Sequence, residues 1–357
     1  MPSSVIWTES EEQLLEQGRL IAATQSSTIT QAVELLRSGG VVAFPTETVY
    51  GLGADAANPQ AVARIFAIKG RPADHPVIVH LSDPCQMVQW AREIPSAAFN
   101  LAERFWPGPL TLILRRRQGV SDLVTGGQDT IGLRIPSHPV ALALLRSFGG
   151  GVAAPSANRF GRISPTTVSH VQQELGSGPD LILEGGECML GLESTILDLT
   201  GKHPAILRPG GISADQLSEA LGEEVRLFAK AEKRIRAPGM LNSHYAPCTP
   251  LRLVPTAELP EVILLCSAVK TSVAVMTCFG SQSFDSHGCR VIQMPSDPIG
   301  YGQKLYAVLR MLDDSDSAII LAEAPPDTTI WMAVNDRLRR AAYSIHTMPT
   351  KTVNSRR

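Results

Sequence analysis

Short apolar runs alternate with amphipathic stretches along most of the chain, a pattern typical of α/β proteins. In the N-terminal part, the apolar runs predict strands at 41–44, 77–81, 110–114, 131–135, 152–154, 181–183, 195–199 and 205–207. Apolar residues at helical spacing predict helices at 95–105, 139–148, 166–175 and 215–221. Because some strands are separated by helices and others follow one another directly, we expect a twisted mixed sheet and not a purely doubly wound one.

Capping residues predict two further helices. Thr30 is expected to cap the first, and Asn58 with Pro59 to begin a second that ends at Gly70. The segment before this second helix, P-T-E-T-V-Y-G-L-G at 45–53, is expected to be a loop. Its glycines permit either a tight turn or a close approach of the backbone to a ligand.

The pattern changes near residue 228. From 229 to 250 the chain is mostly polar and contains several prolines, which predicts an interdomain linker. Beyond it, a second alternation predicts strands at 251–254, 262–266, 273–277, 291–294 and 318–322, and helices at 302–312 and 331–342. We therefore expect an α/β domain with a twisted mixed sheet over 25–228, the linker over 229–250, and a smaller Rossmann-like α/β domain over 251–347.

Composition narrows the function classes. The 357 residues are 44% hydrophobic, which is ample for two cores, and 32 basic against 34 acidic residues argue against a protein that mainly grips a phosphate backbone. Brief contact with RNA remains compatible with this charge. The six cysteines show neither C-x-x-C pairs nor zinc spacing, so we expect free thiols in a reducing compartment. The sequence shows neither a signal-peptide pattern nor an apolar run of about 18 residues, and a cytoplasmic protein without a membrane span is expected.

Several predicted element ends carry side chains suited to ligand binding, although each has an ordinary structural explanation. Lys69-Gly70-Arg71 ends a helix, where the helix dipole favours cations in any case. Ser156-Ala157-Asn158 follows a strand directly, which is where open α/β sheets bind ligands. Ser164 precedes a helix N-terminus, where it either caps the helix or binds phosphate oxygens.

Polar side chains also lie inside apolar strands. Arg134 either bonds an internal carboxylate or faces a cleft and binds a ligand carboxylate with its two-pronged guanidinium. His80 has the same ambiguity, and a core histidine is the commoner case. Arg208 lies at a strand end beside two glycines, where it is placed to reach a phosphate.

The common nucleotide and hydrolase signatures are missing from the sequence. It contains no G-x-x-x-x-G-K-[ST], no G-x-G-x-x-G after the first strand, and neither G-x-S-x-G nor H-E-x-x-H. A P-loop, a dinucleotide fingerprint and the usual serine or zinc hydrolase sites are therefore not expected.

Taken in order, the motifs resemble those of one enzyme family, the YrdC-type threonylcarbamoyl-AMP synthases. These motifs are P-T-E-T-V-Y-G-L-G, K-G-R-P-A-D-H-P, V-H-L, W-P-G-P-L-T, G-L-R-I-P, A-P-S-A-N, G-R-I-S-P-T, E-S-T-I and L-R-P-G-G, from about residue 29 to 213. The peptide S-H-Y-A-P at 243–247 is similar to the linker of the long, two-domain form of the family.

The resemblance implies synthesis of threonylcarbamoyl-AMP and pyrophosphate from L-threonine, bicarbonate and ATP. The product would pass to the machinery that modifies tRNA at the adenosine next to the anticodon, with at most transient tRNA contact by this chain. Lys69 and Arg71 are the implied catalytic cations. The implied ATP ligands are Lys69, Arg71, His75, Thr130, Ser156, Asn158, Ser164, Arg208 and Tyr245. The implied threonine ligands are Thr48 or Thr46, His80, Arg134, the Ala154 backbone and Ser194.

These residue types suit that reaction. Arg134 can fix the threonine carboxylate, while the amine must be neutral, so no carboxylate partner is expected beside it. Cations would offset the charge that develops during nucleotidyl transfer. Mg²⁺ would accompany ATP, bound mostly through phosphates and water, with no protein metal site. Because the intermediates decompose in water, a lid is expected, and the 229–250 linker is the candidate.

Two rivals have weaker support. A hydrogenase-maturation carbamoyltransferase contains a similar module, but it would carry zinc-finger parts that need C-x-x-C pairs. An RNA-binding or ribosome-assembly factor without catalysis is disfavoured by the nearly neutral charge.

Overall fold

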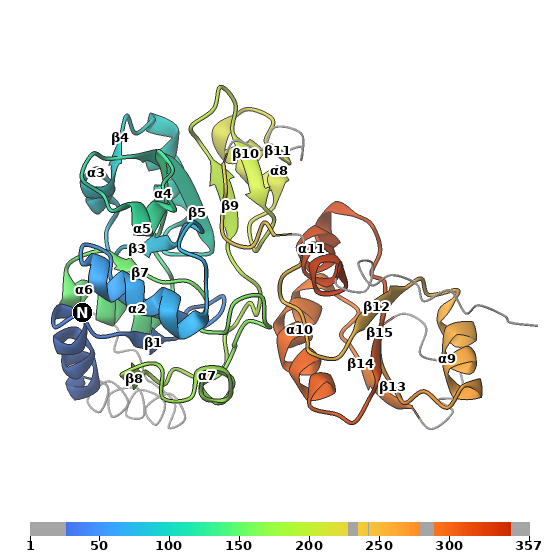
Figure 1. The fold of residues 1–357 in the computed structure, drawn as a ribbon. Coiled ribbons are helices and arrows are strands. Elements are labelled where there is room, and N and C mark those ends of the chain that lie inside the picture. The colour runs from blue at the N-terminus through green and yellow to red at the C-terminus, as the bar shows by residue number, and fades with distance from the viewer. Residues whose placement is uncertain (1–25, 228–234, 242, 279–288, 344–357) are drawn as a thin grey trace, which may run out of the picture.

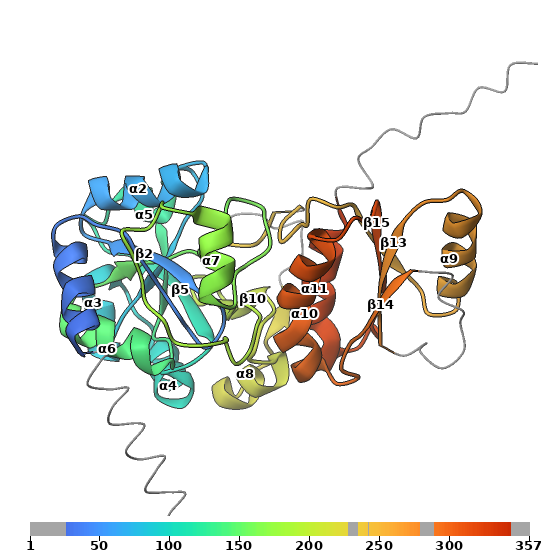
Figure 2. The ribbon, with the colours of Figure 1, turned by 90° about the horizontal axis from the view of Figure 1, so that it is seen from below.

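The structure, a computed structural model, describes residues 26–227, 235–241, 243–278 and 289–343. Two α/β domains stand side by side, joined by the linker (Figures 1 and 2). Parts of the predicted domain ranges, residues 25, 228–234, 242, 279–288 and 344–347, lie outside the described residues, as does the N-terminal segment in which no targeting signal was expected.

The N-terminal domain is built on a mixed sheet with strand order β11-β10-β9-β5-β6-β3-β7-β2-β1-β8, to which β4 adds by pairing with β5. The strands are β1 Val42–Phe44, β2 Gly51–Asp55, β3 Ile78–His80, β4 Ala91–Arg92, β5 Leu110–Arg116, β6 Thr130–Arg134, β7 Val152–Ala153, β8 Leu181–Ile182, β9 Thr195–Asp198, β10 Ala205–Arg208 and β11 Arg226–Leu227. The sheet contains both parallel and antiparallel pairs, which confirms the expected mixed sheet.

Helices cover this sheet. After a helix over residues 26–37 come α2 Pro59–Lys69, α3 Met87–Trp90, α4 Ser96–Phe105, α5 Asp122–Thr125, α6 Pro139–Phe148, α7 Val168–Leu175 and α8 Ala214–Leu221, with a 3-10 turn at Pro84–Gln86. The predicted limits of α2 are confirmed: the Asn58 side chain accepts from two backbone amides at its start, and Gly70 ends it in the left-handed conformation.

The C-terminal domain has a parallel sheet of order β12-β15-β13-β14. Its elements are β12 Leu251–Val254, α9 Leu259–Ala268, β13 Val273–Thr277, β14 Arg290–Gln293, α10 Pro298–Asp313, β15 Ile319–Glu323 and α11 Met332–Ala341, with a 3-10 turn at Thr329–Trp331. Helices α10 and α11 lie between this sheet and the N-terminal domain, and α9 covers the far face (Figures 1 and 2).

Three local predictions were wrong. Residues 262–266 lie in α9, where Leu259, Val262 and Ile263 are buried at helical spacing, because a short apolar run alone does not distinguish a buried strand from a helix. Thr30 lies inside the first helix, and its hydroxyl bonds the carbonyl of Ser26.

The third error concerns the glycine-rich segment at 45–53, whose end is strand β2. Gly53 serves packing within the sheet, whereas Gly51 lies at a cavity described below. A Cβ at Gly53 would lie 2.6 Å from a Phe44 ring carbon and 2.8 Å from a Val152 methyl. The absence of a side chain therefore lets the ring of β1 lie against β2.

Three strands present motif residues at one edge of the sheet. Strands β3 and β6 are parallel, and the pairings through β5 and β9 make β10 run in the same direction. Their last residues, His80, Arg134 and Arg208, therefore end at a common edge, and this edge forms part of the site.

Candidate active site

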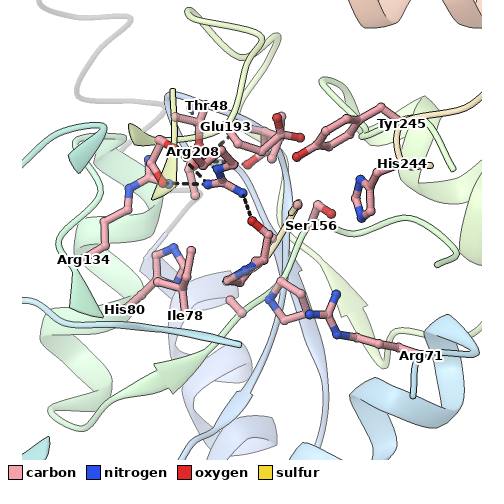
Figure 3. A pocket seen from close by; sticks show the side chains of 18 residues that line it. Thr48, Arg71, Ile78, His80, Arg134, Ser156, Glu193, Arg208, His244 and Tyr245 are labelled. Carbon is pink, nitrogen blue, oxygen red and sulfur yellow. Dashed lines mark hydrogen bonds between the residues drawn. The ribbon is translucent and has the colours of Figure 1, made fainter. Parts of the chain in front are cut away.

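A cavity lies among the strand ends of the N-terminal domain and the linker, and it encloses about 530 Å³ free of protein atoms, including its opening. Figure 3 shows Arg134 and His80 at one end, and Arg71, His244 and Tyr245 at the other. The lining residues are Thr46, Thr48, Val49, Gly51, Arg71, Ile78, His80, Arg134, Ala154, Pro155, Ser156, Glu193, Ser194, Arg208, Pro238, Gly239, His244 and Tyr245.

Buried polar atoms without partners gather at this cavity. Within the described part of the chain, four of them belong to lining residues: Nε of Arg71, Nδ1 of His80, Nδ1 of His244 and the Tyr245 hydroxyl. A fifth, Oδ1 of Asn158, belongs to the segment that follows the lining residue Ser156. Buried polar groups in folded proteins are normally hydrogen-bonded. This concentration therefore indicates a site that a polar ligand or water completes.

The Arg134 end combines a buried ion pair with a neutral histidine. Arg134 donates to Glu47 at 2.6 Å and to the Gly108 carbonyl at 3.2 Å, so it bonds an internal carboxylate and lines the cavity at once. Burial, and then the charge of Arg134, lowers the pKa of His80 to about 3. His80 is therefore neutral near pH 7.

Glu47 bears on the expectation of no carboxylate at this end. Its other oxygen accepts from the backbone amide of Ser137 at 3.0 Å, and it is not among the residues that line the cavity. A carboxylate is thus present behind Arg134, but both its oxygens already have protein partners.

Hydroxyl groups line the floor. Thr46 accepts from the Thr48 amide and donates to the Val49 carbonyl at 2.6 Å, and its hydroxyl lies 2.7 Å from that of Thr48. Ser194 lies 2.8 Å from the Thr111 hydroxyl. Thr46 is therefore engaged in the turn, whereas Thr48 carries the more available hydroxyl of the pair.

Arg208 is held between a strand and the linker. All its nitrogens donate: to the Ser194 carbonyl at 3.1 and 2.9 Å, to the Ser194 hydroxyl at 3.0 Å, and to the Pro238 carbonyl of the linker at 3.0 Å. The following turn needs glycine, since a Cβ at Gly210 would lie 2.3 Å from the Thr195 amide nitrogen. Glycine thus allows the L-R-P-G-G turn to pack on the E-S-T-I segment.

Lys69 and Arg71 differ in their contacts. Lys69 is buried, and its ammonium donates to the backbone carbonyls of Ser156, at 2.6 Å, and Asn158. Burial and the charge of Arg71 lower the pKa of Lys69. Arg71 donates to the Pro76 carbonyl at 2.8 Å, and its guanidinium carbon lies 5.6 Å from the centre of the Phe160 ring. Lys69 therefore supports the S-A-N segment, whereas Arg71 reaches the cavity.

Two family models cover the chain. Residues 34–210 match the Sua5/YciO/YrdC model, described as "Telomere recombination", and residues 212–343 match the model described as "Threonylcarbamoyl-AMP synthase, C-terminal domain". The curated threonylcarbamoyl-AMP synthase of Pyrococcus abyssi is 39% identical over 320 residues, covering 87% of this chain and 93% of the relative. That of Bacillus subtilis is 40% identical over 332 residues, covering 90% and 94%.

The chain belongs to the threonylcarbamoyl-AMP synthase family. A crystal structure of the Pyrococcus abyssi protein Sua5, complexed with L-threonine, matches the fold with a TM-score of 0.82 at 39% identity, covering 88% of this chain and 94% of that one. The family predicted from the motifs and the expected two-domain α/β fold are thereby confirmed.

Most residues assigned from the threonylcarbamoyl-AMP synthase motifs meet at the cavity. Those that line it are Thr46, Thr48, Arg71, His80, Arg134, Ala154, Ser156, Ser194, Arg208 and Tyr245. Lys69, His75, Thr130, Asn158 and Ser164 are not among the lining residues.

Four of the other five are close to the site. Lys69 holds the S-A-N segment as described, and the Asn158 amide donates to the carbonyls of Arg159 and Arg162. His75 lies with its ring centre 5.2 Å from that of Phe160. Ser164 donates to Glu193 at 2.6 Å.

Thr130 lies further from these contacts. It is the first residue of β6 and pairs with Arg115 on β5. Arg134, which lines the cavity, is the last residue of the same strand, so Thr130 lies at the other end of β6.

Sequence reasoning missed several residues of the site. Glu193 lies inside the quoted E-S-T-I motif, and His244 inside S-H-Y-A-P, so the motifs themselves were the available signal. Burial, followed by opposing contributions from nearby charges, brings the pKa of His244 to about 3. No group of three or more His, Cys, Asp or Glu side chains in the described ranges is arranged to hold a metal ion.

Proposed function

We propose that this member of the threonylcarbamoyl-AMP synthase family makes threonylcarbamoyl-AMP and pyrophosphate from L-threonine, bicarbonate and ATP in this cavity. The observation that carries the proposal is one cavity that has Arg134 and His80 at one end and Arg71 at the other, with Arg208 also on its wall. The relative whose structure was determined with L-threonine supports threonine as a substrate.

At the Arg134 end, the guanidinium would attract the threonine carboxylate. Two of its nitrogens already bond protein acceptors, which fixes its orientation before a ligand arrives. Neutral His80 offers a hydrogen-bonding nitrogen without a charge. The Ala154 backbone and the hydroxyls of Thr48 and Ser194 would complete this threonine subsite.

Arg71 at the other end and Arg208, which is bonded to Ser194, would bind ATP phosphates, with Ser156 on the same cavity wall. Lys69, Asn158 and Ser164 would support this wall, and Tyr245 would cover the nucleotide. We assign His75 and Thr130 to the periphery of the nucleotide subsite on the family resemblance alone. A phosphate on Arg208 would compete with the Pro238 carbonyl, so ATP binding would displace that linker contact.

The chemistry proposed is two successive bond formations. The neutral threonine amine first captures the CO₂ unit of bicarbonate as a carbamate, with loss of water. A carbamate oxygen then attacks the α-phosphorus of ATP, the bond to the bridging oxygen breaks, and pyrophosphate leaves with that electron pair. Fixed cations stabilise the charge on the leaving group, and the docked linker limits hydrolysis of the reactive product.

Mg²⁺ is proposed to arrive with ATP. The two carboxylates of the site, Glu47 and Glu193, are each bonded to an arginine, so the donors left for a metal are the phosphates and water. When bound, the ion would neutralise phosphate charge. The residues present fit this role, since they supply cations and hydroxyls and not a carboxylate cage.

Downstream, the product would pass to the machinery that transfers threonylcarbamoyl to the tRNA adenosine next to the anticodon. We propose a cytoplasmic location for the reaction, with at most transient tRNA contact by this chain. The described helices are too short or too polar to cross a membrane.

Pyrophosphate release tests the proposal. Purified protein should release pyrophosphate from ATP only when L-threonine and bicarbonate are both present, and mass spectrometry should detect threonylcarbamoyl-AMP. Equal release with L-serine, or release without bicarbonate, would contradict the mechanism.

A further inference from the structure

A carboxylate lies on the cavity wall among the cations. Glu193 lines the cavity next to Ser194 and Arg208, and its side chain is 8% exposed. Burial alone would raise the pKa of Glu193, but Arg337, Arg208 and the Ser164 hydroxyl bring it to about 2. Glu193 is therefore charged where the triphosphate is proposed to bind.

The partners of this carboxylate come largely from the C-terminal domain. Arg337 of α11 donates from Nε to Glu193 at 2.7 Å, and its side chain is fully buried. The Tyr306 hydroxyl of α10 lies 2.9 and 3.2 Å from the two carboxylate oxygens. Ser164 is the N-terminal-domain donor.

The same two side chains hold the linker. The guanidinium carbon of Arg337 lies 5.2 Å from the centre of the Tyr245 ring, and the Tyr306 ring centre lies 5.7 Å from it. Tyr245 is itself buried and lines the cavity. One arginine of the second domain thus touches both a charged wall residue and the linker side chain that closes the site.

An unneutralised carboxylate at this position would repel ATP, because like charges in a dry pocket act on each other at close range with little screening. Arg208 is already bonded to Ser194 and Pro238, so the direct counter-charge on Glu193 is Arg337. Asp336, the other acidic partner of Arg337, is also bonded to Arg340.

We propose that Arg337 is a positioning residue for the nucleotide: it neutralises Glu193 and seats Tyr245, so that the C-terminal domain completes the ATP end of a site built mostly by the other domain. This inference rests on the proposed function. It assigns Arg337 no contact with the reacting atoms.

A charge-rescue experiment tests it. Arg337→Met should raise the KM for ATP about tenfold and leave the KM for threonine within about twofold. Adding Glu193→Gln should remove most of the ATP effect, since the repelling charge is gone. Arg339→Met, which removes an exposed arginine from the same helix, is the matched control and should behave as wild type.

The pH dependence gives an independent readout. The titratable and charged groups that face Glu193 are Arg208, His244, Tyr245, Tyr306, Arg337 and Asp336. Without Arg337 the pKa of Glu193 should rise, so lowering the pH should lower the ATP KM of Arg337→Met relative to wild type. The inference would be overturned if the ratio of the ATP KM of Arg337→Met to that of wild type did not change with pH. It would also be overturned if Glu193→Gln gave no rescue in the double variant.

Its failure is distinguishable from that of the proposed function. If wild-type protein releases no pyrophosphate with threonine and bicarbonate, the proposed function fails, and calorimetric binding of ATP then decides the inference alone. Should Arg337→Met not fold, Tyr306→Phe keeps the ring and removes one hydrogen bond to Glu193. It should raise the ATP KM about twofold to threefold, again suppressed by Glu193→Gln; an unchanged KM would count against the inference.

Discussion

Two buried arginines, Arg134 and Arg208, line one cavity and differ in how far their nitrogens are already bonded. Arg134 leaves part of its guanidinium free beside Glu47, whereas every nitrogen of Arg208 already has a protein acceptor. A ligand that binds Arg134 adds to the existing hydrogen bonds of its guanidinium. A ligand that binds Arg208 must replace some of the hydrogen bonds that its guanidinium already makes. The two residues should therefore respond differently to the two substrates.

Matched lysine substitutions separate these roles, since lysine keeps the charge but loses the planar fork. Arg134→Lys should raise the KM for threonine about tenfold and change the KM for ATP little, and Arg208→Lys should do the reverse. Steady-state pyrophosphate release measures both. Arg146→Lys, on the exposed face of α6, serves as the control, and parallel changes in both KM values would refute the assignment of the two ends.

His80 should make stability depend on pH. Its folded pKa is about 3, below the usual 6.5, so the unfolded chain binds more protons between these values. Above about pH 6.5 His80 is neutral in both states and costs no stability. As the pH falls from 6.5 toward 3, the free energy of unfolding decreases, and the loss amounts to about 2 kcal/mol at pH 5. Denaturant melts of His80→Gln should show a shallower pH slope than wild type.

The exposed His203→Gln variant controls for loss of a histidine. An equal pH slope in wild type and His80→Gln would show that His80 does not titrate in this way.

At the scale of elements, the described part of the linker is bound to the surface of the N-terminal domain. Its Arg236 exchanges two backbone hydrogen bonds with the Gln128 amide, at 2.6 and 3.0 Å, and its guanidinium donates to the Gly126 carbonyl at 2.6 Å. Further along, the Ala246 amide donates to the Gly161 carbonyl. Polar composition predicted a linker but gave no sign of these docking points.

Removing the Gln128 amide should weaken the binding of the linker to the N-terminal domain. Gln128→Ala loses both reciprocal bonds, so protease cleavage between 235 and 241 should become faster while the thermal midpoint of the folded domains changes little. Mass spectrometry of timed digests gives the cleavage sites. Gln118→Ala, an exposed glutamine in the same domain, should leave the rate unchanged; equal cleavage of all three proteins would show that Gln128 does not hold the linker.

Across the whole molecule, the two domains share packing and a carboxylate anchor. The C-terminal core continues into Val49, Ile163 and Leu192 of the other domain. Asp313 at the end of α10 accepts from the amides of Cys248 and Thr249 at 2.9 and 2.7 Å, and from Arg162 at 3.0 Å. The domains are therefore expected to unfold together.

Asp313→Ala should uncouple them. It leaves two amides and a half-buried guanidinium without their acceptor, and calorimetry should resolve two unfolding transitions where wild type shows one. Asp316→Ala, on the following loop, is the control, since the bond that Asp316 makes to Ser272 in the described part of the chain uses its backbone carbonyl and not its carboxylate. One transition in Asp313→Ala at the wild-type midpoint would show that this anchor does not couple the domains.

Much of the fold was predictable because it depends on local periodicity and capping. The limits of α2 follow from Asn58, Pro59 and Gly70, which act within one turn of the helix ends. The prediction of a strand at 262–266 was wrong because a short apolar run is compatible with either a buried strand or a helix. Packing on the sheet decided for helix α9. Strand β2 was not predicted because Gly53 is required by the Phe44 ring on the neighbouring strand, and this contact forms only in the folded sheet.

By itself, the sequence determined the family, the two-domain α/β order and most residues of the cavity, since ordered motifs carry the backbone and side-chain requirements of the site. Only the tertiary structure decided which partners those residues have. Arg134 and Glu47 are 87 positions apart, and Glu193 and Arg337 are 144 apart. The energy of a buried charge depends on the groups that lie next to it, because a low-dielectric site screens little. Which groups become neighbours is decided only when the chain folds.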